Sequence, residues 1–202
     1  MDAGRALGSW CDRIRAEFEP AIHAISRHLE VRHVDVVAYA SESVIPELGM
    51  NAYTEHAHLI RFWLDPSHPN LAQSFEVSFP ALLAHELHHL VRERGPGYGR
   101  TLRDSLISEG LACQFEKEVT GKIPIYGAEI ATGEVAERLA RIAPFLDGPY
   151  SPGWMFGSHD QGIERSFGYQ LGSSLVAQWL KRQGKTAAQA VHITTQEIAH
   201  GW

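Results

Sequence analysis

One segment constrains the fold of this 202-residue chain more than any other, the run Ala84-His85-Glu86-Leu87-His88-His89. The run is backed by an apolar stripe at the spacing of one helical face, made of Leu83, Leu87, Leu90 and Val91. His85 and His89 stand four residues apart, so a helix places both imidazoles one turn apart, on the side opposite the stripe. The pattern predicts a helix that packs one face on a core and presents two histidines on the other.

The spacing of the two histidines is that of a metal site, because both rings can reach a single ion. Glu86 is rotated by about 100° from His85, so its carboxylate can lie beside the metal and take a proton from a water molecule on it. A bare H-E-x-x-H arises in roughly one shuffled sequence of this composition in twenty, so its context matters. The alternative is a helix with a few exposed histidines.

A catalytic zinc site needs a third protein ligand, and Glu109 is the best candidate. It lies 20 positions after His89, on a helix expected to begin at a Thr101 cap and to end near Thr120. Its helical face also carries the apolar or small residues Leu102, Leu106, Ala112 and Cys113. A carboxylate in apolar company requires a partner, which a metal would supply. The alternative partner is a cation such as Arg100 or Arg103.

The rest of the chain predicts a mostly helical α+β fold with a small sheet in its N-terminal half. Helices are expected over residues 5–30, 78–94, 101–120, 132–142 and 162–182, followed by one or two short ones, and strands over 34–39 and 58–64. The helix at 78–94 is expected to begin at a Ser78 cap, with Pro80 in its first turn, and to stop at Gly95-Pro96-Gly97, while Gly121 closes the helix at 101–120. Residues 41–57 and 144–161 are expected to be loops, because proline and glycine interrupt them. The length suits one domain over residues 1–202.

Composition narrows the class of partner and the compartment. The net charge of −6 and the pI of about 6.0 give no reason to expect nucleic acid or an anionic membrane. Cys11 and Cys113 are too few for a disulfide framework and are expected to be free thiols. No apolar stretch is long enough for a signal sequence or a membrane span, so we expect a cytoplasmic protein. The oligomeric state is not set by these features.

Two motifs together resemble a known class of enzyme. The run 84–89 followed by residues 104–112 (DSLISEGLA) is similar to the gluzincin, or thermolysin-like, zinc peptidases, and more narrowly to a bacterial family known only as predicted zinc-dependent proteases. Gly168-Tyr169-Gln170-Leu171-Gly172 resembles a further segment of that family, and the similarity covers residues 55–182. The resemblance implies a single zincin-like domain whose H-E-x-x-H helix carries the active site, and hydrolysis of peptide bonds in a peptide or protein substrate.

The resemblance also implies roles for particular residues. Zn²⁺ would be bound by His85, His89 and Glu109, with Glu86 as general base. The chain departs from the thermolysin pattern four residues after the third ligand, where an aspartate often supports a histidine ligand and this chain has Cys113. The support must then come from elsewhere, and the two candidates are Asp104 and Glu116.

Amide hydrolysis also needs a donor that stabilises the anionic tetrahedral intermediate. Tyr169 and His159 are the candidates, and the alternatives are a packed tyrosine and an ordinary loop histidine. His88 adjoins the ligands but points to the flank, so we expect it to support the site or lie on the surface. The strand at 58–64 is either a sheet edge that pairs with substrate or a core strand.

Two rival functions remain open at this point. One is a zinc-binding regulatory or interaction domain without catalysis, against which the intact Glu86 speaks, because a structural site needs no base. The other is a metal-free helical binding protein in which the motif is accidental.

Overall fold

The computed structural model describes residues 6–200 and 202. The chain divides into two compact units, one reaching Val91 and the other beginning at Arg92. Helix α2 (Leu71–Glu93) contains the point of division near its C-terminal end. The expectation of one domain over residues 1–202, of which 1–5 and 201 lie outside the described residues, stays a prediction.

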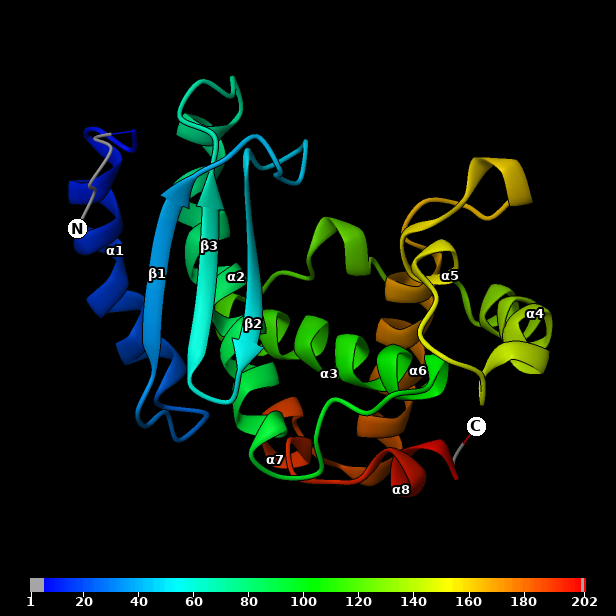
Figure 1. Ribbon diagram of the computed structural model, residues 1–202. Helices are drawn as coiled ribbons and strands as arrows, with labels where there is room; N and C mark the ends of the chain where they lie inside the picture. The colour runs from blue at the N-terminus through cyan, green and yellow to red at the C-terminus, as the bar shows by residue number, and fades with distance from the viewer. Residues whose placement is uncertain (1–5, 201) are drawn as a thin grey trace. The chain divides into compact units, whose positions relative to one another are not determined.

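The first unit contains a three-stranded sheet in the order β1-β3-β2 (Figure 1). Its strands are β1 (Asp35–Ala40), β2 (Met50–His56) and β3 (Leu59–Leu64). β2 and β3 form an antiparallel hairpin, and β1 pairs in parallel with the other side of β3. The two strands expected from the sequence are confirmed. However, β3 is the middle strand, so the interpretation of residues 58–64 as a sheet edge is wrong.

β2 lies in the segment 41–57, which the sequence predicts to be a loop. Its inward-facing residues are Met50, Ala52 and Thr54, of which only the first is a large apolar residue. Such a strand shows no clear alternation of apolar and polar residues, and the nearby Pro46 and Gly49 favour a loop. Pairing with β3 supplies the stabilisation that the pattern of β2 does not reveal.

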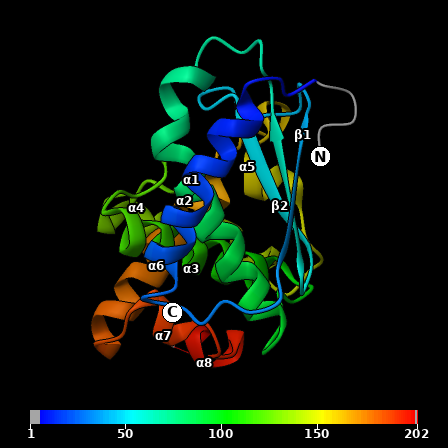
Figure 2. The ribbon, with the colours of Figure 1, turned by 90° about the vertical axis from the view of Figure 1, so that its left-hand side faces the viewer.

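Helices α1 (Trp10–Ile25) and α2 cover the same face of this sheet (Figure 2). Alternate residues of β3 point to that face and are fully buried, among them Phe62, whose ring centroid lies 5.0 Å from that of Phe79 on α2. Phe75 stacks on Phe79 at 5.1 Å, and Trp10 of α1 contacts Phe75 at 5.2 Å. These aromatic contacts hold the two helices on the sheet. α1 is shorter than the predicted 5–30, whose first residue is not described.

α2 begins seven residues before the expected cap at Ser78 and has Pro80 inside it. Proline in a helix interior removes one backbone hydrogen bond and is costly. Leu71, Phe75 and Phe79 are spaced four apart and fully buried, so packing of this face outweighs that cost. The expected end of the helix near residue 94 is confirmed.

The second unit is helical. Its α-helices are α3 (Leu102–Thr120), α4 (Thr132–Ile142), α5 (Pro152–Phe156), α6 (Phe167–Gln183), α7 (Ala187–Ala190) and α8 (Thr195–Ala199), and its 3₁₀ turns are η1 (Ile125–Gly127), η2 (Ala143–Phe145) and η3 (His159–Gln161). The expected helix at 132–142 and the two short C-terminal helices are confirmed. The expected loop at 144–161 contains short helical turns instead, and α6 begins at Phe167 because the preceding Ser166 adopts a left-handed conformation.

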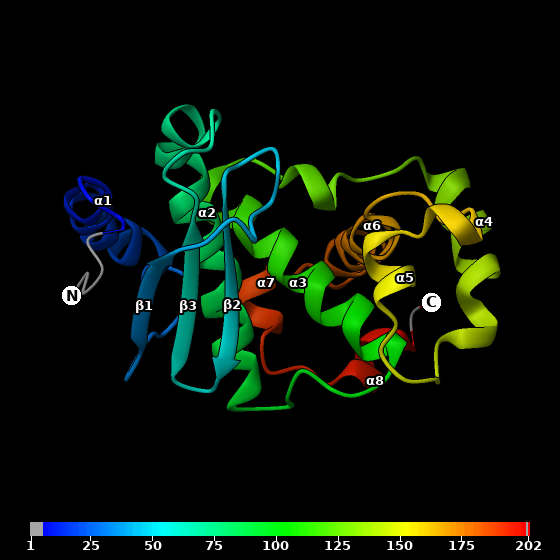
Figure 3. The same cartoon turned by 45° about the horizontal axis from the view of Figure 1, so that its top comes forward.

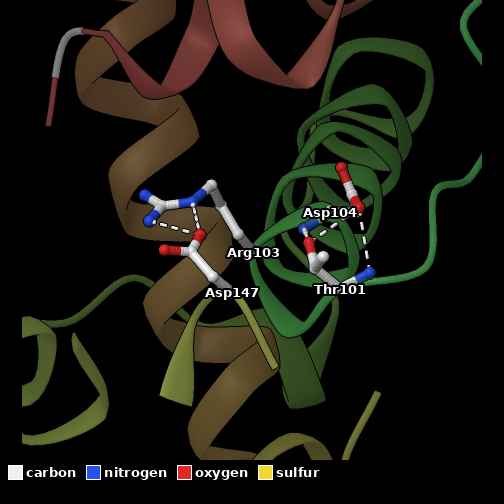
Figure 4. A network of polar contacts seen from close by, with 4 residues as sticks. All are labelled: Thr101, Arg103, Asp104 and Asp147. Atoms are coloured by element: carbon white, nitrogen blue, oxygen red, sulfur yellow. Dashed lines mark hydrogen bonds and ion pairs between the residues drawn. The ribbon is translucent and has the colours of Figure 1, made fainter. Parts of the chain in front are cut away.

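α3 has the N-terminal cap that the sequence predicted. The Thr101 hydroxyl accepts the Asp104 N–H at 3.1 Å, and the Asp104 carboxylate accepts the Thr101 N–H at 2.9 Å, which completes a capping box (Figure 4). Gly121 ends the helix in the left-handed region at φ 75°. The helix therefore has fixed ends, and Glu109 lies in its middle.

α6 packs along α3, with α4 and α5 against α6 (Figure 3). The two helices approach closely at two glycines. A Cβ on Gly110 would lie 2.4 Å from the Gly172 carbonyl oxygen, and one on Gly172 would lie 2.2 Å from the Leu106 carbonyl oxygen. Both glycines belong to the motifs that carried the resemblance, so those motifs are partly explained by this helix contact. The apolar core of this unit lies beside it, around Leu106, Phe167 and their neighbours.

The whole is a mostly helical α+β chain with a small sheet in its N-terminal half, as expected. Among the described residues, no helix combines the length and the apolar character that crossing a membrane requires.

Candidate active site

The first unit brings two imidazoles together on α2. The Nε2 atoms of His85 and His89 lie 3.0 Å apart, and the two rings are nearly perpendicular at 76°. Two nitrogens bound to one zinc at about 2.05 Å with tetrahedral angles are about 3.3 Å apart. The pair therefore fits the spacing that two histidine ligands of a zinc ion adopt.

The general base predicted from the sequence, Glu86, is fixed by the sheet. The Thr54 hydroxyl of β2 lies 2.8 Å from Glu86 Oε2 and 2.8 Å from the Glu86 main-chain oxygen. A hydroxyl has a single proton, so it shares that proton between the two acceptors. The contact joins the edge strand of the sheet to the residue between the two histidines and limits the rotamers of the Glu86 side chain.

Every residue from 82 to 92 is buried, so α2 is covered around its whole circumference here. The apolar stripe that includes Leu87 and Leu90 is fully buried, as expected. His85 and His89 are also buried, at 4% and 7% exposure, so the alternative of a helix with exposed histidines is wrong. His88 was expected either to support the site or to lie on the surface. It is fully buried, so the surface position is excluded.

The second unit gives Glu109 a tyrosine partner. The Tyr98 hydroxyl donates to Glu109 Oε1 at 2.5 Å, and the Glu109 side chain is buried. Arg103, one of the alternative partners, pairs instead with Asp147 at 2.9 Å (Figure 4). The backbone N–H of Arg100, the other alternative, donates to Asp104. One observed partner of Glu109 is thus the hydroxyl of a tyrosine.

Burial, and secondarily the negative charge of Glu109, raises the pKa of Tyr98 well above its ordinary value. The phenol therefore stays protonated at neutral pH and acts as a hydrogen-bond donor to the carboxylate. Tyr169 and Tyr150 lie near enough to raise the pKa of Tyr98 further. Glu109 thus stands at the end of a cluster of tyrosines.

A second tyrosine–carboxylate pair lies about two helical turns further along α3. The Tyr126 hydroxyl donates to Glu116 Oε1 at 2.5 Å, and burial raises the pKa of Tyr126 as well. The ring of Tyr169 contacts that of Tyr126 at 5.4 Å. Of the two expected supporting carboxylates, Glu116 is therefore engaged by Tyr126, and Asp104 by the helix cap.

The two candidate donors for the reaction intermediate have different surroundings. Tyr169, near the start of α6, lies among Tyr98, Tyr126 and Phe156, whose ring centroid is 5.6 Å away. His159 lies on η3 with its side chain fully exposed, and its Nδ1 is 3.8 Å from the Asp160 carboxylate. Within the second unit, the structure thus brings Tyr169, and not His159, close to the tyrosine partner of Glu109. The roles of both residues stay predictions.

Sequence reasoning missed two residues of the site, Thr54 and Tyr98. Thr54 stands in the segment 41–57, where nothing indicated a strand. Tyr98 stands between Gly97 and Gly99 in the break after α2, which was interpreted only as a helix stop. A single aromatic residue within a glycine-rich turn was the available signal, because such a turn can fold a side chain back onto the next helix.

Comparison with known proteins gives one match. A family model described as "Predicted Zn-dependent protease (DUF2268)" matches residues 14–200. No curated protein and no solved structure matches the chain.

Proposed function

We propose that this chain, which belongs to the DUF2268 family of predicted Zn-dependent proteases, is a zinc peptidase that hydrolyses peptide bonds in peptide or protein substrates. The observation that carries the proposal is the buried pair of imidazoles on α2, with Nε2 atoms 3.0 Å apart and the carboxylate of Glu86 held by the sheet. A helix whose function was only to pack would gain nothing from two adjacent buried imidazoles and a buried carboxylate, because each is costly to desolvate.

In this proposal the zinc ion is bound by His85, His89 and Glu109. These three residues are the ligand set of the gluzincin type. The three side chains form a candidate set of metal ligands, and all are buried. Two imidazoles and one carboxylate are the donors of many catalytic zinc sites, which keep a further position open. When bound, zinc acts as a Lewis acid that lowers the pKa of water and polarises the scissile carbonyl.

Glu86 would act as general base and acid. Its carboxylate accepts a proton from the attacking water and then delivers that proton to the leaving amine. The Thr54 hydroxyl, 2.8 Å from Oε2, holds the carboxylate in one orientation. A donor to the anionic tetrahedral intermediate is also required, and Tyr169 and His159 are the candidates. The position of Tyr169 beside Tyr98 favours Tyr169.

We place the peptide along β2. Beyond the Ile45–Met50 bridge at its start, no described segment pairs with the outer edge of this strand. An extended peptide can add to such an edge through main-chain hydrogen bonds. Hydrogen exchange of the Glu86→Gln variant with a bound peptide should show new protection in β2 (Met50–His56) and none in β1.

The test of the proposed function compares the wild type with Glu86→Gln on a broad peptide library. We expect the wild type to cleave peptides and the variant to lose cleavage while keeping its zinc. Glu76→Gln is the matched control, because Glu76 lies on the same helix with a largely exposed side chain. Equal activity of the wild type and Glu86→Gln would exclude Glu86 as the base.

The same measurements separate the two rivals. A regulatory zinc domain would bind zinc stoichiometrically and leave every peptide intact. A metal-free binding protein would purify without zinc and take up none.

A further inference from the structure

The loop between α2 and α3 folds back so that its aromatic side chain reaches the middle of α3. Tyr98 is eleven residues before Glu109, yet its hydroxyl lies 2.5 Å from the Glu109 carboxylate. The loop has the sequence Gly95-Pro96-Gly97-Tyr98-Gly99. Gly97 and Gly99 adopt φ values of 83° and 91°, which other residues rarely take, so the reversal depends on these two glycines.

The backbone of Tyr98 is fixed on both sides. Its N–H donates to Glu93 Oε2 at 3.0 Å, and its carbonyl accepts the hydroxyl proton of Ser108 at 3.0 Å. Ser108 is the residue next to Glu109, and the buried Arg92 donates to its hydroxyl at 3.3 Å. The loop is therefore attached to α3 one residue away from the carboxylate that its side chain contacts.

We propose that Tyr98 is a positioning residue for zinc, which acts by holding one oxygen of the Glu109 carboxylate so that the other is presented to the metal. This inference rests on the proposed function, because it takes Glu109 as a ligand. The reasoning is geometric. A hydrogen bond at Oε1 fixes the rotation of the carboxylate plane, and a fixed carboxylate loses less entropy when it binds an ion.

Tyr126 shows what a tyrosine–carboxylate contact on α3 does at a carboxylate outside the proposed ligand set. Its partner Glu116 belongs to a second group that could hold a metal, with His85 and Cys113, so the Tyr126 variant also tests that alternative site. Tyr126 is half-buried, donates to Glu116 at the same 2.5 Å, and contacts the ring of Tyr169. Replacing either tyrosine with phenylalanine removes a hydroxyl of the same kind from a similar environment. The two substitutions are therefore matched in their cost to stability, and only Tyr98→Phe changes the surroundings of Glu109.

The experiment measures the zinc dissociation constant of the purified protein by competition with a chromophoric chelator. We expect Tyr98→Phe to weaken zinc binding by about 10–100-fold, the usual effect of removing a group that orients a metal ligand. Tyr126→Phe should stay within about threefold of wild type. Unchanged affinity in Tyr98→Phe, or equal losses in both variants, would overturn the proposal.

A second readout follows the geometry of the site. In protein loaded with Co²⁺, the visible spectrum reports the coordination number, and Tyr98→Phe should change it because Oε1 of Glu109 loses the hydroxyl that holds it. Tyr126→Phe should leave the spectrum unchanged, and an unchanged spectrum in Tyr98→Phe would contradict the proposal. If Tyr98→Phe does not fold, Ser108→Ala releases the Tyr98 carbonyl and removes one acceptor of Arg92. This variant should weaken zinc binding in the same direction, and unaltered affinity would count against the proposal.

Failure of this inference and failure of the proposed function give different results. If Glu109→Ala releases zinc and Tyr98→Phe does not weaken it, only the positioning role is wrong. If the wild type binds no zinc, or if Glu109→Ala retains it, the ligand assignment itself is wrong and the role of Tyr98 fails with it.

Discussion

Replacing Arg92 with methionine should destabilise the second unit strongly. Arg92 is fully buried, and burial lowers the pKa of its guanidinium to about 10. Its side chain donates to the carbonyls of Val191 and Ile193 at 3.2 and 2.8 Å and to the hydroxyls of Ser108 and Thr195 at 3.3 and 3.4 Å. One cation thus joins the segment before α8 to α3.

The size of the destabilisation follows from the acceptors that lose their donor in the variant. Two hydroxyls can turn to other partners, whereas a buried carbonyl left without a donor costs about 1–3 kcal/mol. The contact at Val191 is buried and the one at Ile193 is half-buried. Methionine is uncharged, so the variant does not have to bury a charge. Even so, removing one partner from a buried charged network costs about 3–5 kcal/mol in total. We therefore expect a loss of about 4 kcal/mol, which for a chain of this size lowers Tm by about 8–16 °C.

Chemical denaturation followed by tryptophan fluorescence measures this loss. The control is Arg103→Met, because Arg103 is also an arginine with hydrogen-bonded partners, but it pairs with Asp147, whose side chain is 84% exposed. An exposed pair is worth less than about 1 kcal/mol, so the control should stay near wild type. The reasoning is refuted if Arg92→Met loses less than the control, or if the two losses are equal.

Three further outcomes are expected. Thr54→Val should lower kcat about tenfold with zinc content unchanged, because Glu86 loses the donor worth about 1.4 kcal/mol that orients it; an unchanged kcat contradicts this. Gly110→Ala should lower the free energy of unfolding by about 3 kcal/mol, because its Cβ would lie 2.4 Å from a carbonyl oxygen of α6. The control Gly133→Ala has open space around its Cβ, so its free energy of unfolding should stay within about 1 kcal/mol of wild type. Burial alone would raise the pKa of Asp104, but the hydrogen bonds of the helix cap outweigh it and lower the pKa. Its carboxylate therefore stabilises the fold above about pH 4 and loses this effect as the pH falls, so acid denaturation should be less steep in Asp104→Asn than in wild type.

The sequence predicted well those features that depend on local pattern. The caps at Thr101 and Gly121 placed α3 correctly, because a capping box and a left-handed glycine are determined by a few adjacent residues. The stripe that includes Leu87 and Leu90 placed the histidine helix for the same reason. Where local rules and packing disagree, prediction failed. Pro80 indicated a helix start, and the buried faces of Leu71 and its successors extended the helix past it.

The features that sequence could not give depend on contacts between distant residues. β2 is a strand because β3 pairs with it, and its own residues have no pattern that indicates this. The contact of Thr54 with Glu86 follows from that pairing, across 32 positions of sequence. The sequence predicts a cation or a metal as the partner of Glu109, and it gives no signal for Tyr98, because a glycine-rich break does not indicate the direction of a side chain.

The central claim is that His85, His89 and Glu109 bind zinc, and the most direct test is the zinc content of the purified protein and its variants. Elemental analysis should find one zinc per wild-type chain, and loss of that zinc in both His85→Ala and Glu109→Ala. The exposed His159 supplies the control, so His159→Ala should keep its zinc. Wild-type protein that neither contains nor takes up zinc, or a Glu109→Ala variant that retains one zinc per chain, would contradict the account.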